Sequence, residues 1–161
     1  MIKLKVAILG ETSKKEVEYF LSWVQRLLPV ESCKIVRPKE LFNEYRYSID
    51  AFFDFVVQPS KTTRYLVLDK QAGRIVGAGY EAYADEEEGI GYNGKGGWVL
   101  FTRKAKKEAV ALATVHELAH SLGLVRRHKD LHCRNRHCIM YPHIPAARFC
   151  RKCAAELKHF K

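Results

Sequence analysis

The stretch His116-Glu117-Leu118-Ala119-His120-Ser121-Leu122-Gly123 carries two histidines and a glutamate at the spacing HExxH, followed by a glycine. Residues four apart lie one turn above each other on a helix, so the imidazoles of His116 and His120 can bind one metal ion. Glu117 lies one position round the helix, where a carboxylate can polarise a water molecule. The spacing predicts a catalytic zinc site on a helix, which we expect over residues 104–122.

A second group of metal-ligand residues follows this helix. Four cysteines fall within 21 residues, at spacings that suit metal binding. Cys133 and Cys138 form CxxxxC, Met140 comes two residues later, and Cys150 and Cys153 form CxxC. These thiols predict a structural zinc site in the C-terminal part of the chain.

Residues 116 to 153 together resemble the archaemetzincins, a family of metzincin zinc metallopeptidases. That family pairs HExxHxxG with a third histidine directly before a CxxxxCxM element and with a later CxxC. The resemblance implies two zinc ions, a catalytic one on three histidines and a structural one on four cysteines. Adjacent side chains in extended backbone point opposite ways, so His132 and Cys133 can serve different metals. The matching positions are His132, Cys133, Cys138, Met140, Cys150 and Cys153.

The segment after Gly123 departs from the family pattern. Glycine adopts positive φ at low cost, so Gly123 is expected to end the helix and let the chain turn back with a third ligand. The family's third histidine falls three residues after this glycine, where this chain has Arg126, whose guanidinium cannot ligate zinc. Matching His132 to the third ligand places an insertion before it. His128 and Asp130 lie in that insertion and are the alternative ligands.

Strand patterns alternate with helical ones along the chain, which indicates an α/β fold. By resemblance to metzincins we expect a twisted mixed sheet with helices, and a small irregular zinc-stapled subdomain below the cleft. Length and apolar content of 47% suit one compact peptidase domain over residues 1–161, in which residues 1–123 form an upper subdomain and residues 124–161 a lower, cysteine-rich one. The expected strands are 2–9, 33–36, 64–69, 74–84 and 96–102, and the expected helices are 13–28, opened by a capping box, and 43–57.

The net charge of +10 is concentrated in residues 126–161, which carry ten Lys or Arg against two acids. Four thiolates around one Zn²⁺ have a local charge of about −2, which these cations offset, so we do not expect a nucleic-acid partner. Residues 1–10 lack the apolar core of a signal peptide, and no apolar run is long enough to span a membrane. Clustered thiols suit a reducing compartment, so we expect a cytoplasmic protein.

The expected reaction is zinc-dependent hydrolysis of peptide bonds. Three imidazoles leave the fourth zinc position for water, with Glu117 as the general base that takes its proton and passes it to the leaving amine. By resemblance, Met140 forms an apolar floor beneath the metal, a strand over 78–83 pairs with an extended peptide, and the substrates are short peptides or N-termini. The alternative is a zinc-stabilised basic module that binds nucleic acid or protein, with the HExxH site vacant or inactive.

Overall fold

Five strands form one mixed sheet in the computed structural model, which describes residues 1–36, 60–71, 80–83, 95–125, 130–143 and 146–160. The strand order is β2-β1-β3-β5-β4. The first four run parallel, and β4 forms an edge antiparallel to β5. The sheet confirms the expected mixed α/β fold. The strands are β1 (Ile2–Gly10), β2 (Val30–Val36), β3 (Thr63–Gln71), β4 (Tyr80–Tyr83) and β5 (Gly96–Thr102).

The face of the sheet beneath the helices is apolar. Ile2, Leu4 and Val6 alternate along β1 and are at most 1% exposed, as the two-residue period of a strand requires. Val6 pairs with Leu66 of β3, which pairs with Gly97 of β5, so these three residues lie side by side on one face. Gly97, which has no side chain, lies where α4 packs closely on the sheet.

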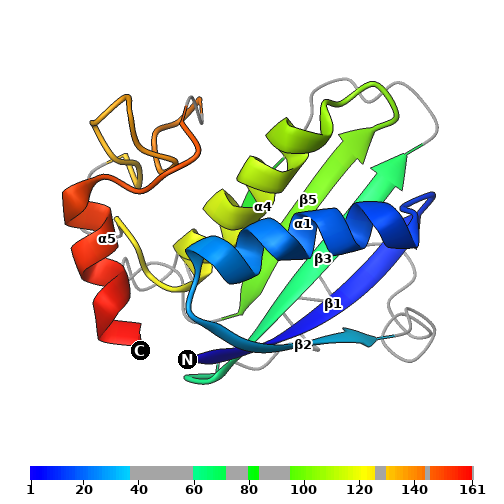
Figure 1. Cartoon of the computed structure of the whole chain (residues 1–161), viewed down its shortest axis with the longest axis horizontal. Helices are drawn as coiled ribbons and strands as arrows, with labels where there is room; N and C mark the ends of the chain where they lie inside the picture. The colour runs from blue at the N-terminus through cyan, green and yellow to red at the C-terminus, as the bar shows by residue number, and fades with distance from the viewer. Residues whose placement is uncertain (37–59, 72–79, 84–94, 126–129, 144–145, 161) are drawn as a thin grey trace.

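Two helices, α1 (Lys14–Leu27) and α4 (Lys107–Ser121), cover this face and contact each other (Figure 1). Phe20 of α1 meets Phe101 of β5 edge to face, with 5.6 Å between ring centroids. α4 packs over β5 and β4 and is buried at every position from Val110 to Ser121. A helix that is apolar around most of its circumference is typically a core helix. α4 is therefore held rigidly, as a site built on it needs.

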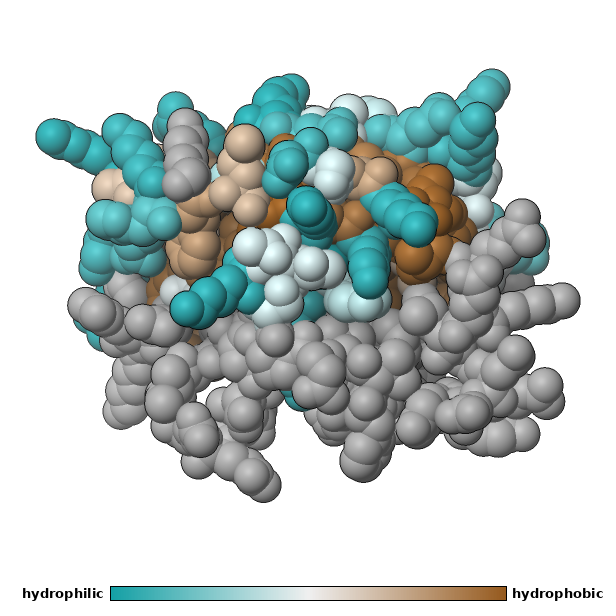
Figure 2. Space-filling model, turned by 90° about the horizontal axis from the view of Figure 1, so that it is seen from below, coloured by the Kyte–Doolittle hydropathy of each residue, from teal (hydrophilic) through white to brown (hydrophobic). Residues whose placement is uncertain are grey.

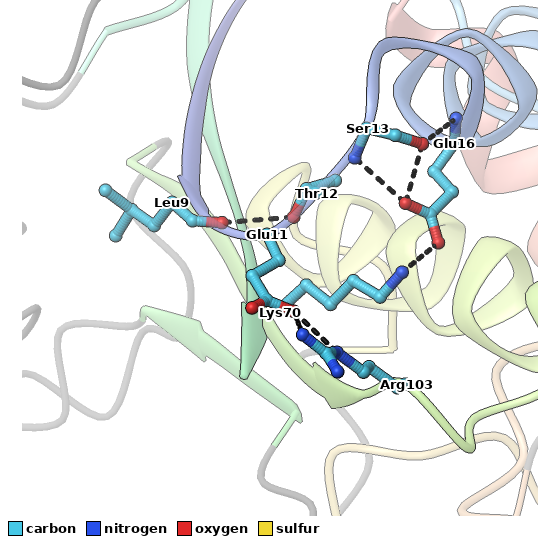
Figure 3. Close-up of polar contacts among 7 residues, drawn as sticks. All are labelled: Leu9, Glu11, Thr12, Ser13, Glu16, Lys70 and Arg103. Carbon is cyan, nitrogen blue, oxygen red and sulfur yellow. Dashed lines mark hydrogen bonds and ion pairs between the residues drawn. The ribbon is translucent and has the colours of Figure 1, made fainter. Parts of the chain in front are cut away.

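The predicted capping box opens α1 (Figure 3). Ser13 Oγ accepts a hydrogen bond from the Glu16 backbone N–H at 3.3 Å, and Glu16 Oε2 accepts one from the Ser13 N–H at 2.9 Å. Glu16 Oε1 also pairs with Lys70 Nζ of β3 at 2.5 Å. Burial by itself raises the pKa of this carboxyl, but its bonds to Lys70 and Ser13 outweigh burial and lower it to about 2.

The described residues 130–143 and 146–160 lie beside the C-terminal end of α4, to the left in Figure 1. They have little regular structure before α5 (Arg151–Leu157) and the short 3-10 helix η2 (Lys158–Phe160). The N-terminal ammonium donates to the Phe160 carbonyl at 2.7 Å, which ties this region back to the start of β1. The sequence predicted an irregular lower subdomain, and α5 was not among the expected helices.

Two expected elements fall on residues that the structure does not describe. The expected helix over 43–57 lies wholly outside the described residues, and of the expected strand over 74–84 only β4 is described. The described surface mixes polarities: seen from below, hydrophilic side chains stand between apolar ones (Figure 2). None of the helices in the described ranges is long and apolar enough to cross a membrane.

Candidate metal centres

His116 and His120 lie one turn apart on the buried α4, as predicted. Their side chains belong to residues only 2% and 3% exposed, and their Nε2 atoms are 2.9 Å apart. The two ring centroids are separated by 4.6 Å. Two ring nitrogens that face each other at this distance are placed to share one cation.

The helix α4 ends in a turn at Gly123, as predicted. Gly123 has a φ of 80°, and its N–H donates to the His120 carbonyl at 2.7 Å. Glycine takes this conformation without a Cβ clash and is the residue most often found just past a helix end. The buried Arg64 of β3 supports the same end, because its Nε donates to the Ser121 carbonyl at 3.0 Å. The helix end carrying His120 is therefore fixed from two sides.

His132 completes a group of three histidines. One ligand nitrogen of each of His116, His120 and His132 lies within 4.8 Å of the others. The His132 ring centroid is 5.3 Å from that of His116 and 5.1 Å from that of His120. His128 and Arg126 lie outside the described residues, whereas Asp130 is exposed and contacts His132 through its backbone carbonyl. Of the two histidines weighed for the third ligand, His132 is the one that the described structure brings to the pair.

Backbone carbonyls orient the rings of His116 and His132. His116 Nδ1 lies 2.7 Å from the Ile139 carbonyl, and His132 Nδ1 lies 2.6 Å from the Asp130 carbonyl. Only a protonated Nδ1 can donate to a carbonyl, so this hydrogen-bond pattern assigns the proton to Nδ1 and leaves Nε2 with its lone pair. Metal-binding histidines are commonly fixed in this tautomer by such a bond.

The buried histidines are neutral at physiological pH. Burial lowers the pKa of His116 to about 4, the Ile139 carbonyl opposes this shift, and His132 adds to it. Burial also lowers the pKa of His120 to about 2, with further contributions from His116 and His132. A metal ligand must be unprotonated. Three histidine ligands fit zinc of the catalytic type, which keeps a position open for water.

Glu117 lies on α4 where the helix packs closely against Gly97 of β5. The residue is 5% exposed. A Cβ placed on Gly97 of β5 would come within 3.0 Å of the Glu117 Cβ. The absence of a side chain at Gly97 therefore allows this segment of α4 to pack directly on the strand. Glu117 directly follows His116 on this closely packed helix.

The four cysteines form a second group, which we term the cysteine cluster. Their Sγ atoms all lie within 4.8 Å of one another, and those of Cys133 and Cys150 are 3.7 Å apart. All four are free thiols. Backbone N–H groups of Asn135 and Cys150 donate to the sulfurs of Cys133 and Cys138 at 3.4 and 3.3 Å. The fifth cysteine, Cys33, lies on β2, apart from the cluster.

The acidity of these thiols indicates how the cluster is stabilised. Hydrogen bonding from Cys153 is the main cause that lowers the pKa of Cys138 to about 5. Burial raises the pKa of Cys133, and the bond to Cys138 together with burial raises that of Cys153. Because thiolates this close repel one another, all four ionise only around a cation. Four cysteine sulfurs are the donor set of structural zinc.

One turn connects the histidine centre and the cysteine cluster. Of two adjacent residues, His132 belongs to the first group and Cys133 to the second. The Cys133 N–H donates to the Met140 carbonyl at 2.8 Å, and Ile139, whose carbonyl holds His116, follows Cys138. The Met140 side chain is fully buried. The sequence carried no signal for the Ile139 carbonyl, because any residue supplies that group.

Known proteins share both the sequence pattern and the fold. The sequence profile of the Reprolysin (M12B) family zinc metalloproteases matches residues 35–161. The archaemetzincin of Methanopyrus kandleri is 22% identical with a TM-score of 0.63, and the match covers 99% of this chain and 94% of that one. The archaemetzincin of Archaeoglobus fulgidus, complexed with malonate, is 20% identical with a TM-score of 0.59, over 96% and 99%. No curated protein matches the sequence. The archaemetzincin-like fold expected from the motifs is confirmed.

Proposed function

Because the chain belongs to the Reprolysin (M12B) family of zinc metalloproteases, we propose that Glu117 is its general base and that His116, His120 and His132 hold its catalytic zinc. As a metzincin-type zinc metallopeptidase it acts on peptides or proteins. The observation that carries the proposal is the convergence of three histidine nitrogens within 4.8 Å beside a buried glutamate. We propose hydrolysis of short peptides or of protein N-termini.

Each residue of the centre has a distinct task in this reaction. Zinc, when bound, supplies Lewis acidity to the scissile carbonyl and to the attacking water. A histidine must be unprotonated to bind a metal, so three histidine ligands would leave the positive charge of the ion uncompensated. Glu117 takes a proton from the water as its oxygen attacks and then passes that proton to the leaving amine. The Ile139 carbonyl keeps His116 in the tautomer that presents Nε2.

The edge strand β4 is proposed to align the substrate. β4 lies at one end of the sheet order, pairs antiparallel with β5, and contacts α4. An extended peptide can add to such an edge through main-chain hydrogen bonds, which bind it without regard to sequence. The peptide would then run past the active-site helix with its carbonyl groups presented in a fixed register.

The lower subdomain is proposed to hold a second, structural zinc on Cys133, Cys138, Cys150 and Cys153, with Met140 as the apolar floor beneath the histidine centre. The donor set and the full burial of Met140 support these roles. We propose that residues 1–161 form one peptidase domain, with residues 1–123 as the upper subdomain and residues 124–161 as the lower, because buried residues of both belong to one core. Four clustered thiols support a cytoplasmic location.

A binding module with an empty histidine centre is the competing function. It is favoured by the exposed cations around the cysteine cluster, which would suit an acidic partner. Family membership favours the peptidase. The exposed cations are Arg134, Arg136, Arg148, Arg151, Lys152 and Lys158.

Zinc content and hydrolysis together test the proposal. Elemental analysis should find two zinc ions per chain, falling to one in the His116→Ala, His120→Ala double variant. Glu117→Gln should keep both ions and lower kcat on a peptide library by about 10³-fold, the usual scale for losing a general base. One ion in both proteins, or hydrolysis that survives Glu117→Gln, would contradict the assigned roles and favour the binding module.

A further inference from the structure

The turn after α4 contains a β-branched residue in the left-handed region. Val125 has a φ of 55° and is 1% exposed. This conformation crowds the Cβ of any L-residue and is an outlier for a β-branched one. Gly123, two residues earlier, takes φ 80° without that penalty. Such a conformation persists only where surrounding contacts hold it, so the contacts of Val125 are informative.

Glu156 of α5 provides a contact at this residue. Its Oε2 accepts a hydrogen bond from the Val125 N–H at 3.2 Å, across 31 positions of sequence. The N–H of the preceding residue, Leu124, still bonds back to the Ala119 carbonyl of α4 at 3.2 Å. A buried N–H without an acceptor is costly. Glu156 thus supplies the acceptor where the hydrogen bonds of α4 itself stop.

The helix that carries Glu156 is anchored in the cysteine cluster. Cys150 is the N-cap of α5, and Cys153 lies in its first turn with no exposed surface. Residues three apart on a helix lie on the same side, so Cys153 and Glu156 both face the body of the protein. The carboxylate therefore reaches the turn after α4 from a helix whose position is set by the four sulfurs.

From these contacts we infer that Glu156 is a positioning residue for the histidine centre. By holding Val125 in its left-handed conformation, Glu156 sets the direction in which the chain leaves α4 and so the position at which His132 meets His116 and His120. The same contact couples the two centres, since α5 is fixed by the cysteine cluster. The inference rests on the proposed role of the three histidines as zinc ligands.

Three variants of the full chain test this role. Glu156→Leu removes the acceptor at similar size, and Glu156→Gln keeps an oxygen acceptor without the charge. Glu18→Leu is the matched control, because Glu18 is an exposed glutamate of α1 whose ion-pair partner is Lys14, at 3.8 Å. The dissociation constant of the second zinc equivalent is measured by competition with a chromogenic chelator. Cobalt loaded at the histidine centre reports its geometry through ligand-field absorption.

Glu156→Leu is expected to weaken zinc binding at the histidine centre by about tenfold or more, the usual cost of losing a residue that supports a metal ligand. The cobalt spectrum should change, whereas the thiolate charge-transfer band of the cysteine cluster should not. Glu156→Gln should restore binding to within a fewfold of wild type, and Glu18→Leu should match wild type. If Glu156→Leu does not fold, Glu156→Asp replaces it in the same measurements, because its carboxylate is shorter by one methylene and lies farther from the Val125 N–H.

A lower melting temperature with unchanged zinc affinity and an unchanged cobalt spectrum would overturn the inference, because it would assign Glu156 a purely structural role. Equal affinity in all variants would do the same while leaving the proposed function intact. A wild-type protein that takes up zinc only at the cysteine cluster would overturn the proposed function and this inference with it.

Discussion

Residues 1–125 and residues 130–160 are held together in different ways. In its described residues, the first region has five paired strands, two helices and an apolar core to which strands and helices contribute. The second has few regular hydrogen bonds, and half of its most buried side chains are thiols that crowd one another. The first region is stabilised by burial of apolar area, whereas the proposed structural zinc would hold the thiols of the second together. The most buried residues of the second are Cys133, Cys138, Ile139, Met140, Cys153 and Leu157.

The largest expected effect separates these two regions directly. Cys138→Ser removes one ligand of the cysteine cluster, and structural zinc contributes on the order of 10 kcal/mol of apparent binding free energy at neutral pH. Hydrogen exchange followed by mass spectrometry should show protection lost over residues 133–157 and retained in β1, β3 and the middle of α4. Cys33→Ser is the control, because Cys33 lies on β2 outside the cluster.

Protection that persists over residues 133–157 in Cys138→Ser would mean that the second region does not depend on its metal. Equal loss in Cys33→Ser would mean that the effect comes from substituting any thiol. Either result would remove the contrast between the regions.

The second prediction tests whether the first region supports the end of α4 by itself. Arg64 is 4% exposed and donates to the backbone carbonyls of Ser121, Ser60 and Thr63. Arg64→Met keeps most of the volume but leaves the buried Ser121 carbonyl without this donor, which should cost about 2 kcal/mol of unfolding free energy. Urea denaturation measures the loss, and Arg64→Lys, which keeps a donor, should lose less. Unchanged stability in Arg64→Met would mean that the end of α4 is stabilised by the second region alone and not by Arg64.

A third prediction concerns pH and only the first region. Glu16 has a folded pKa of about 2 against an ordinary value of 4.5. A depressed pKa stabilises the fold above pH 4.5, and this contribution is lost as the pH falls toward 2. Glu16→Gln should therefore lower the unfolding free energy by about 1–3 kcal/mol at pH 7 and by much less at pH 2.5.

Acid releases zinc from the variant and the wild type alike. The difference between their unfolding free energies therefore reports the contribution of the Glu16 carboxyl alone. Glu18→Gln is the control: its pair with Lys14 is exposed, and such pairs contribute under about 1 kcal/mol. A penalty for Glu16→Gln that is the same at both pH values would show that the carboxylate of Glu16 is not the stabilising form.

Much of both regions could be predicted because the signals are local. The spacing of His116 and His120 places both on one helix face, Gly123 ends that helix as expected, and Ser13 with Glu16 forms the predicted capping box. His132 joined the histidines and its neighbour joined the cysteine cluster, since residue chemistry and the alternation of extended chain suffice for that. In each case the deciding information lies within a few residues.

The contacts between elements could not be predicted, because they join distant residues or use groups that every residue has. The Ile139 carbonyl that orients His116 comes from 23 positions away, and Arg64 reaches Ser121 over 57. Glu156 lies on α5, a seven-residue helix too short to show a helical period in the sequence. These residues are selected by tertiary packing, which one sequence does not reveal.

The smallest expected effect on stability comes from Gly97→Ala. This substitution changes only the first region, so it tests whether that region alone affects the rate of the proposed reaction. The added Cβ would lie 3.0 Å from the Glu117 Cβ and 3.3 Å from its backbone carbon, so α4 must move away from β5 by a few tenths of an ångström. Overpacking of this kind costs about 1 kcal/mol of stability. A misplacement of about 1 Å costs about 10²-fold in rate, so this smaller shift should lower kcat by roughly threefold to tenfold. Zinc content should stay at the wild-type value, because His116 and His120, two of the three proposed ligands, move together with the helix. A normal kcat with reduced stability would show that β5 moves to make room for the added Cβ and that α4 stays in place. The position of Glu117 would then be set by the second region.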